Sequence, residues 1–175
     1  MDKKEIRKAV LEKRRLIIDK EQKSRVIQQK VIEACKEYKN IGIYMNTPYE
    51  VETVYCIEEL QRLGKNIYIP SVVGDCMEFR KFHAYSELKK GKYGILESEG
   101  EVLNQLDCLV LPLVAFDANN NRLGMGKGYY DRFMSIYKIP YCIGIAFEEQ
   151  RLDAVPMEAH DVSLDCIITE NKIYL

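Results

Sequence analysis

The segment AFDANNNRLGMGKGYYDRF, residues 115–133, gathers the residue types that bind phosphate groups. Its chemistry-bearing members are three alternating glycines, three cations and one carboxylate: Gly124, Gly126, Gly128, Arg122, Lys127, Arg132 and Asp131. Glycines let backbone N–H groups approach a ligand without a Cβ in the way. A carboxylate beside a bound phosphate is suited to hold Mg²⁺. The segment therefore predicts an anion-binding or nucleotide-phosphate loop, and a structural turn with solvated charges remains the alternative.

The loop follows the strongest buried-strand pattern in the chain, residues 107–116, and precedes a predicted helix over residues 129–137. In open α/β sheets, ligands bind at the carboxyl ends of the strands. The start of a helix adds unpaired N–H donors and the positive end of its dipole. The loop is not a Walker A motif, because no Ser or Thr follows Lys127, and it does not match G-x-G-x-x-G.

Strand and helix patterns alternate from residue 41 onward. Short apolar runs predict strands over residues 41–45, 66–70, 107–116, 141–147 and 166–169, and residues 77–82 read as a short strand or hairpin arm. A helix is expected over residues 52–63, ended by Gly64. Residues 84–105 have no clear assignment. Near-continuous apolar strands that alternate with helices predict an α/β fold with a mostly parallel sheet, covered on both faces.

The first 39 residues predict two helices. Ile6, Val10 and Ile17 mark an apolar stripe on the first, and Asp19 with Gln22 resembles a capping box that would begin the second. We expect one domain over residues 1–175, with this helical segment at its N-terminus.

Composition excludes several classes of protein. Lys and Arg total 26 against 27 Asp and Glu, and this balance argues against a general nucleic-acid binder. No apolar run reaches the roughly 20 residues of a membrane helix, and the charged N-terminus does not resemble a signal peptide. We therefore expect a soluble, cytoplasmic protein with small-molecule ligands, as a monomer or weak dimer. The six cysteines are expected to be reduced core thiols, and with only two histidines a transition-metal site is disfavoured.

The string NRLGMGKGYYDRF, residues 121–133, resembles the signature R-L-G-x-G-x-G-Y-Y-D of the 5-formyltetrahydrofolate cyclo-ligase family, also called 5,10-methenyltetrahydrofolate synthetases. Four further matches lie along the chain: Lys3 with Arg7, residues 51–53 (V-E-T), residues 68–70 (Y-I-P) and residues 146–150 (A-F-x-x-Q). The resemblance departs at Met125, where an Arg or aromatic residue is frequent, and at Ser98, where proline is common.

The resemblance implies an ATP- and Mg²⁺-dependent ring closure. The formyl oxygen of 5-formyltetrahydrofolate would attack the γ-phosphate of ATP and form an N5-iminium phosphate. N10 would then attack that carbon, and the products would be 5,10-methenyltetrahydrofolate, ADP and phosphate. Phosphoryl transfer of this kind requires positioning and charge neutralisation more than covalent help from the protein.

The resemblance also implies site residues. ATP would contact Lys3, Lys4, Arg7, Arg122, Leu123, Gly124, Met125, Gly126, Lys127, Gly128, Tyr129 and Tyr130. The catalytic cations would be Lys127, for the γ-phosphate, and Arg122. The folate would contact Thr47, Glu52, Met125, Gly126, Lys127, Gly128 and Tyr129, with Glu52 facing the donor edge of the pterin. Asp131 and Asp161 would hold the metal, and Asp165 competes with Asp161 for the second position.

Residue patterns alone are compatible with several alternatives. Lys3 and Arg7 share one helical face, as a phosphate clamp requires, but also fit a solvated basic helix. Glu52 also fits the first turn of a helix. A non-catalytic nucleotide-binding module would keep the glycine loop and need neither Glu52 nor Asp161. A phosphosugar isomerase needs a separate acid–base pair, which no motif supplies. An RNA-binding first helix would lack stacking aromatics, since none precedes Tyr38.

Overall fold

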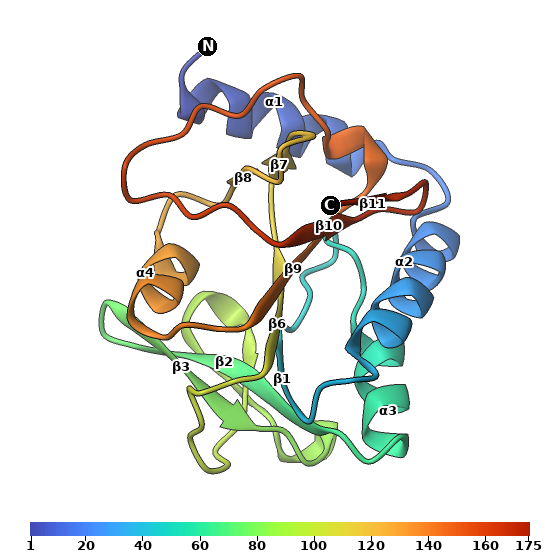
Figure 1. Cartoon of the computed structure of the whole chain (residues 1–175), viewed down its shortest axis with the longest axis vertical. Helices are drawn as coiled ribbons and strands as arrows, with labels where there is room; N and C mark the ends of the chain where they lie inside the picture. Colours follow the sequence, from blue (N-terminus) through green and yellow to red (C-terminus); the bar gives the residue numbers. More distant parts are fainter.

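A seven-stranded sheet forms the centre of the computed structural model, which describes residues 1–175 (Figure 1). Its strands follow the order β11-β10-β9-β6-β1-β2-β3. Their bounds are β1 Asn40–Ile43, β2 Asn66–Val73, β3 Cys76–Lys81, β6 Cys108–Pro112, β9 Tyr141–Ile145, β10 Cys166–Ile168 and β11 Ile173–Tyr174. The five inner strands are parallel, and β3 and β11 pair antiparallel at the two edges. The predicted α/β fold with a mostly parallel sheet is confirmed.

Helices cover both faces of this sheet. The four α-helices are α1 Lys3–Arg15, α2 Lys20–Cys35, α3 Val54–Arg62 and α4 Tyr129–Ile136. Helices α2 and α3 lie on one side and α4 on the other, while α1 crosses over the ends of the strands beside β7 and β8 (Figure 1). In α1, Ile6 and Val10 pack on Val114 and Leu123, which fixes this helix above the sheet. None of the helices is long and apolar enough to cross a membrane.

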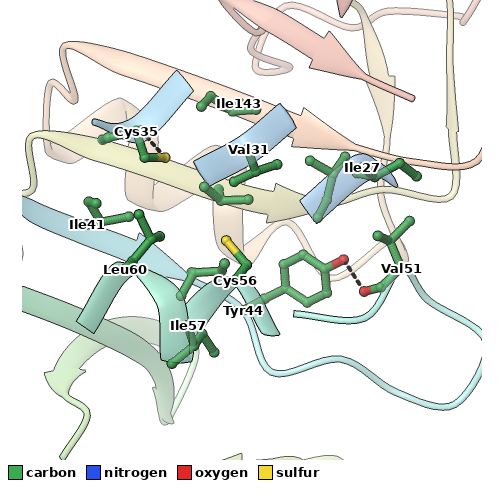
Figure 2. Close-up of a cluster of buried hydrophobic side chains, with 14 of the residues drawn as sticks. Ile27, Val31, Cys35, Ile41, Tyr44, Val51, Cys56, Ile57, Leu60 and Ile143 are labelled. Atoms are coloured by element: carbon green, nitrogen blue, oxygen red, sulfur yellow. Dashed lines mark hydrogen bonds between the residues drawn. The ribbon is translucent and has the colours of Figure 1, made fainter. Parts of the chain in front are cut away.

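Alternate residues of each strand face opposite helices. In β6, Cys108 and Val110 join the cluster formed with α2 and α3, whereas Leu109 and Leu111 join the cluster around Phe133 of α4. This period of two is the geometry of a strand that is buried on both faces. Figure 2 shows the first cluster, in which Ile27, Val31 and Cys35 of α2 meet Cys56, Ile57 and Leu60 of α3 over the sheet.

The cysteines are free thiols, and five of the six are buried as expected. Cys35 and Cys108 face each other in the core with their sulfur atoms 3.9 Å apart. Cys76 is the exception, because it begins the edge strand β3 and is exposed.

The two predicted N-terminal helices are confirmed, but the predicted capping box at Asp19 is wrong. Asp19 has a left-handed backbone with φ of 56°, and its side chain makes no capping hydrogen bond. The chain needs this conformation to turn sharply between α1 and α2. A capping box forms instead at the start of α1, where Asp2 accepts from the Glu5 N–H and Glu5 accepts from the Asp2 N–H.

Helix α3 ends as predicted at Gly64, whose φ of +82° is suited to glycine. The N–H groups of Gly64 and Lys65 bond to the carbonyls of Gln61 and Leu60, which is the Schellman arrangement. Its start lies two residues later than predicted, at Val54. Thr53 precedes the helix and remains in the loop, because its hydroxyl donates to the Tyr44 carbonyl at 2.9 Å.

The strand predicted over residues 107–116 is two strands. Strand β6 ends at Pro112, and β7 (Ala115–Phe116) pairs with β8 (Arg122–Leu123) in a separate two-stranded sheet. Leu113 and Val114 leave the main sheet between them, and the buried side chain of Gln150 donates to both of their carbonyls at 2.9 Å. An amide from a distant segment therefore replaces the ladder partners that the bend removes.

Residues 84–105, which the sequence pattern leaves unassigned, contain a small hairpin. Strands β4 (Lys89–Lys90) and β5 (Leu96–Glu97) pair antiparallel. A single turn of 3-10 helix, η1 (Tyr85–Glu87), precedes them, and a second one, η2 (Lys92–Gly94), connects them. A third such turn, η3, covers Glu148–Gln150. Strand β11 is also not predicted from the sequence. The tip of the hairpin reaches the glycine loop, where Tyr93 lies near Lys127 and Tyr129.

Candidate active site

A cavity of about 780 Å³ opens at the carboxyl ends of β1 and β6. These strands are neighbours, and the chain proceeds from β1 toward β2 on one side and from β6 toward β9 on the other. The loops that leave them therefore diverge and leave a crevice, which is where ligands bind in open α/β sheets. The cavity is lined by residues that follow β1 (Tyr44, Met45), by residues that follow β6 and by the face of α1 that carries Lys3 and Arg7.

The glycine loop forms one end of the cavity. Gly126 and Gly128 have φ of +97° and +72°, a conformation that other residues rarely adopt. None of the backbone N–H groups of residues 124–131 donates a hydrogen bond to another residue, so none of them is already paired within the protein. Arg7 reaches across from α1 and donates from Nε to the Gly124 carbonyl at 2.7 Å. The loop is thus held open and lined with donors, as an anion site requires.

Arg122 lies beneath this loop, almost fully buried. Its side chain is 3% exposed, and its Nη2 atom lies 3.4 Å from Oδ2 of Asp131. Burial lowers the pKa of the Arg122 guanidinium, and the Asp131 carboxylate offsets part of that effect. The Nε atom has no hydrogen-bond partner. A Cβ on Gly124 would lie 2.7 Å from Nη1 of Arg122, so glycine at this position lets the loop pass directly over the cation.

Lys127, by contrast, is exposed at the rim of the cavity. Its ammonium group lies 5.9 Å from the ring centre of Tyr93, at the tip of the hairpin. The hydroxyl groups of Tyr93 and Tyr129 are 3.2 Å apart, so the hairpin and the start of α4 meet here. The Lys127 ammonium makes no hydrogen bond or ion pair that would restrain it, which leaves its charge available to a bound anion.

Asp131 and Asp161 lie together although 30 positions separate them. Oδ1 of Asp131 accepts from the Val162 N–H at 3.3 Å, and both carboxylates line the main cavity and a smaller one of about 400 Å³ beside it. Lys3 contacts Oδ2 of Asp161 at 2.5 Å. Burial acts to raise the pKa of Asp161, but the Lys3 ammonium and the Glu158 N–H outweigh it, and the pKa is lowered.

Asp165, the competing residue, lies outside both cavities. Its Oδ2 accepts from the Cys142 N–H at 2.7 Å, which anchors the start of β9. Asp161 has two further neighbours with metal-ligating groups: Glu158 and His160 place their ligand atoms within 4.8 Å of its carboxylate and of each other. Glu158 and His160 are exposed, and both line the main cavity.

The other end of the cavity differs from the predicted site. Thr47 lines it, but Glu52 does not: its side chain is exposed outside the cavity, and its N–H bonds to Ser24. Glu50 takes that place. Its Oε1 accepts from the Thr47 N–H at 2.8 Å, which closes the turn after β1 and directs the carboxylate into the cavity.

Two tyrosines and one arginine accompany Glu50. Burial and the charge of Glu50 raise the pKa of both Tyr44 and Tyr130 above the ordinary range. Arg14, near the end of α1, is 7% exposed and also lines the cavity. Burial lowers its pKa, and Glu50 opposes that effect.

All other residues predicted to bind ATP or substrate line the cavity: Lys3, Lys4, Arg7, Thr47 and residues 122–130. Met125 is 64% exposed at its rim. Ser98 lies elsewhere, donating to the Lys81 carbonyl.

The sequence patterns did not point to four residues that line the cavity: Arg14, Tyr44, Glu50 and Tyr93. For Glu50 a signal existed, since a glutamate three residues after Thr47 can close a turn directly behind a strand.

The fold and the site define a class: an α/β protein whose ligand cavity at the topological switch point has cations and unpaired N–H donors at one end. Comparisons with known proteins agree. A probable 5-formyltetrahydrofolate cyclo-ligase of Schizosaccharomyces pombe is 35% identical over 178 aligned residues, covering 90% of this chain and 87% of that protein. The 5-formyltetrahydrofolate cyclo-ligase of Escherichia coli K12 is 32% identical, covering 77% of this chain and 79% of that protein.

Solved structures show the same similarity along nearly the whole chain. The NMR structure of 5,10-methenyltetrahydrofolate synthetase from Aquifex aeolicus matches with a TM-score of 0.83 and 33% identity, covering 99% of this chain and 92% of that one. The enzyme of the same name from Mycoplasma pneumoniae matches with a TM-score of 0.79 and 31% identity, covering 97% and 99%. The model of the 5-formyltetrahydrofolate cyclo-ligase family matches residues 1–170, and this chain belongs to that family.

Proposed function

We propose that the protein cyclises 5-formyltetrahydrofolate to 5,10-methenyltetrahydrofolate and converts ATP to ADP and phosphate, with the formyl oxygen leaving in the phosphate. The observation that carries this proposal is the division of one cavity into two chemically different ends. One end has cations and eight unbonded N–H groups, from residues 124–131, which suit a triphosphate. The other has Glu50, tyrosines and apolar side chains, which suit a heteroaromatic ring with N–H donors.

In the first step the formyl oxygen on N5 attacks the γ-phosphorus of ATP. The bond from that phosphorus to the bridging oxygen breaks, and ADP leaves. Negative charge spreads over the transferred phosphoryl group, and the barrier falls when fixed positive groups surround it. We assign this work to Lys127, which reaches the γ-phosphate from the rim, and to Arg122 beneath the loop. Arg7 and the loop N–H groups hold the remaining phosphates.

In the second step the electrophilic N5-iminium phosphate is trapped by N10. The N10 lone pair forms the new C–N bond, N10 loses its proton, and the C–O bond to phosphate breaks. The products are the 5,10-methenyl cation and inorganic phosphate. The protein's contribution is to hold N10 close to the activated carbon and to exclude water, which would otherwise hydrolyse the intermediate.

Asp131 and Asp161 fit a magnesium ion. Both are hard oxygen donors that line the same two cavities, and Mg²⁺ needs only one or two protein carboxylates. The contact of the Lys3 ammonium group with Asp161 supports this proposal, because it already places a cation beside that carboxylate. Bound there, Mg²⁺ would neutralise charge on the phosphate oxygens.

Glu50 replaces Glu52 as the residue that recognises the folate. A carboxylate accepts from the ring N–H and the exocyclic amine of a pterin side by side. Glu50 lines the cavity and is fixed by the Thr47 N–H, whereas Glu52 faces solvent. Thr47 borders the same end.

The test follows the near-ultraviolet absorbance of the methenyl product. Purified protein is mixed with 5-formyltetrahydrofolate, with and without Mg·ATP, and ADP release is measured in parallel. Growth of the chromophore only with Mg·ATP, together with equimolar ADP, is the expected result. ATP binding without any turnover would refute the proposal and favour a non-catalytic nucleotide-binding module.

A further inference from the structure

Arg14 is a buried cation without a partner. Its side chain lies on the last turn of α1, is 7% exposed and lines the cavity. It makes no hydrogen bond and no ion pair, and its Nε atom is buried without an acceptor. Buried guanidinium groups are normally paired, because burying an uncompensated charge is costly. A partner supplied by the ligand would account for a charge that the protein leaves unmatched.

Among charged groups, Glu50 has the largest effect on the pKa of Arg14. It lines the same cavity but forms no ion pair with Arg14. Both side chains therefore line the cavity without being paired to each other, and each can bind a ligand. A negative ligand at Arg14 would be repelled by the Glu50 carboxylate. A neutral ligand that presents donors to Glu50 and an adjacent acceptor to Arg14 would satisfy both groups.

Both groups stand on rigid supports. Helix α1 is fixed by Ile6 and Val10, which pack into a buried cluster with Val114 and Leu123. The loop that carries Glu50 is tied down behind it, where the Tyr44 hydroxyl donates to the Val51 carbonyl at 2.7 Å (Figure 2). A pair of groups held this firmly can discriminate between ligands that differ by one hydrogen-bonding atom.

Building on the proposed function, we infer that Arg14 donates to the 4-oxo oxygen of the pterin ring, while Glu50 accepts from the neighbouring N3–H and 2-amino groups. In a pterin these three groups occupy consecutive ring positions, so one edge presents two donors followed by one acceptor. Arg14 then selects 4-oxo over 4-amino rings, because a 4-amino group would direct a donor at the guanidinium. It is a specificity residue, distinct from the cations that contact phosphate.

The experiment compares two ligands and three variants. Dissociation constants are measured by calorimetry for 5-formyltetrahydrofolate and for 5-formyl-4-amino-4-deoxytetrahydrofolate, without ATP. The variants are Arg14→Met, which removes the donors, Arg14→Gln, which keeps a neutral donor, and Arg15→Met, the matched control on the exposed side of α1. Circular dichroism and thermal melting confirm that each is folded.

A charge-assisted hydrogen bond changes affinity by about 10- to 100-fold. We expect Arg14→Met to reduce the preference for the 4-oxo ligand by about that factor, Arg14→Gln to reduce it less, and Arg15→Met to leave it unchanged. An equal loss of affinity for both ligands in Arg14→Met would overturn the assignment to the 4-oxo group. An unchanged preference would overturn it as well. Failure of the wild-type protein to bind or turn over 5-formyltetrahydrofolate is a separate result that would refute the proposed function itself.

Discussion

Replacing Asp131 with asparagine removes the charge that compensates buried Arg122. Their side chains are 17% and 3% exposed, and the 3.4 Å contact between them is the only ion pair that Arg122 makes. The Nε atom of Arg122 has no partner either. Asparagine preserves the shape of the side chain, so the substitution isolates the effect of charge.

The geometry sets the size of the expected loss. Two unit charges 3.4 Å apart interact with about 5 kcal/mol at an effective dielectric constant of about 20. Removing one partner of a buried pair costs roughly 3–5 kcal/mol in other proteins. Here the cavity admits water, and asparagine still offers an oxygen to the guanidinium. We therefore expect the free energy of unfolding to fall by about 2–3 kcal/mol.

Urea denaturation without ligands measures this loss, with Asp153→Asn as a control because that aspartate is exposed and makes no hydrogen bond. The decisive comparison repeats Asp131→Asn in an Arg122→Met background. With the buried cation gone, the second substitution should cost less than about 1 kcal/mol. An equal cost in both backgrounds would show that Asp131 does not compensate Arg122, and the reasoning would be wrong.

Three further outcomes are expected. Lys127→Ala should lower kcat by about 100-fold or more without changing the melting temperature, because Lys127 is exposed and unpaired; wild-type turnover in the folded variant would remove it from the mechanism. Glu50→Gln should raise KM for 5-formyltetrahydrofolate about 10- to 100-fold in steady-state kinetics, whereas Glu52→Gln should not; the reverse pattern would favour Glu52 as the folate ligand. Lys3→Met should lower stability by about 1 kcal/mol at neutral pH. The folded pKa of Asp161 lies below the ordinary 3.8, so the stability difference between wild type and Lys3→Met should shrink as the pH falls below 3.8 and Asp161 becomes protonated. Urea titrations at each pH measure this difference, and a difference independent of pH would contradict the role of the ion pair.

The fold was largely predictable because buried parallel strands are apolar along their length, as in residues 107–116 and 141–147. The same apolar pattern concealed the end of strand β6 at Pro112. Leu113 and Val114 are as apolar as the strand before them, and only the Gln150 amide, from a distant segment, satisfies the carbonyls that leave the sheet. The hairpin over residues 89–97 was missed for the opposite reason: its strands are two residues long and carry little pattern.

The site was predictable where it is contiguous in sequence. The glycine loop carries its cations and the proposed metal ligand within one short segment, so its composition favoured a phosphate site over a structural turn. Arg14 gave no such signal, and the spacing of Glu50 from Thr47 indicated only a turn. Arg14 lies in the run KRR, which is typical of a solvated helix end. Glu50 lies two residues before Glu52, and by sequence alone either glutamate could bind the folate. Only the packing of α1 and the turn closed by the Thr47 N–H distinguish the residue that enters the cavity from its neighbour.

Helix α1 connects the two ends of the site. Lys3, Arg7 and Arg14 are spaced by four and seven residues, which places them along one helical face, and all three line the cavity. Lys3 and Arg7 lie by Asp161 and the glycine loop, while Arg14 lies by Glu50. The helix itself is held in place by the buried side chains of Ile6 and Val10. In the proposed complex α1 contacts both substrates, so the distance between the γ-phosphate and the formyl oxygen would depend on the position of α1. We therefore expect α1 to position the two ligands relative to each other, so that binding of either one favours binding of the other.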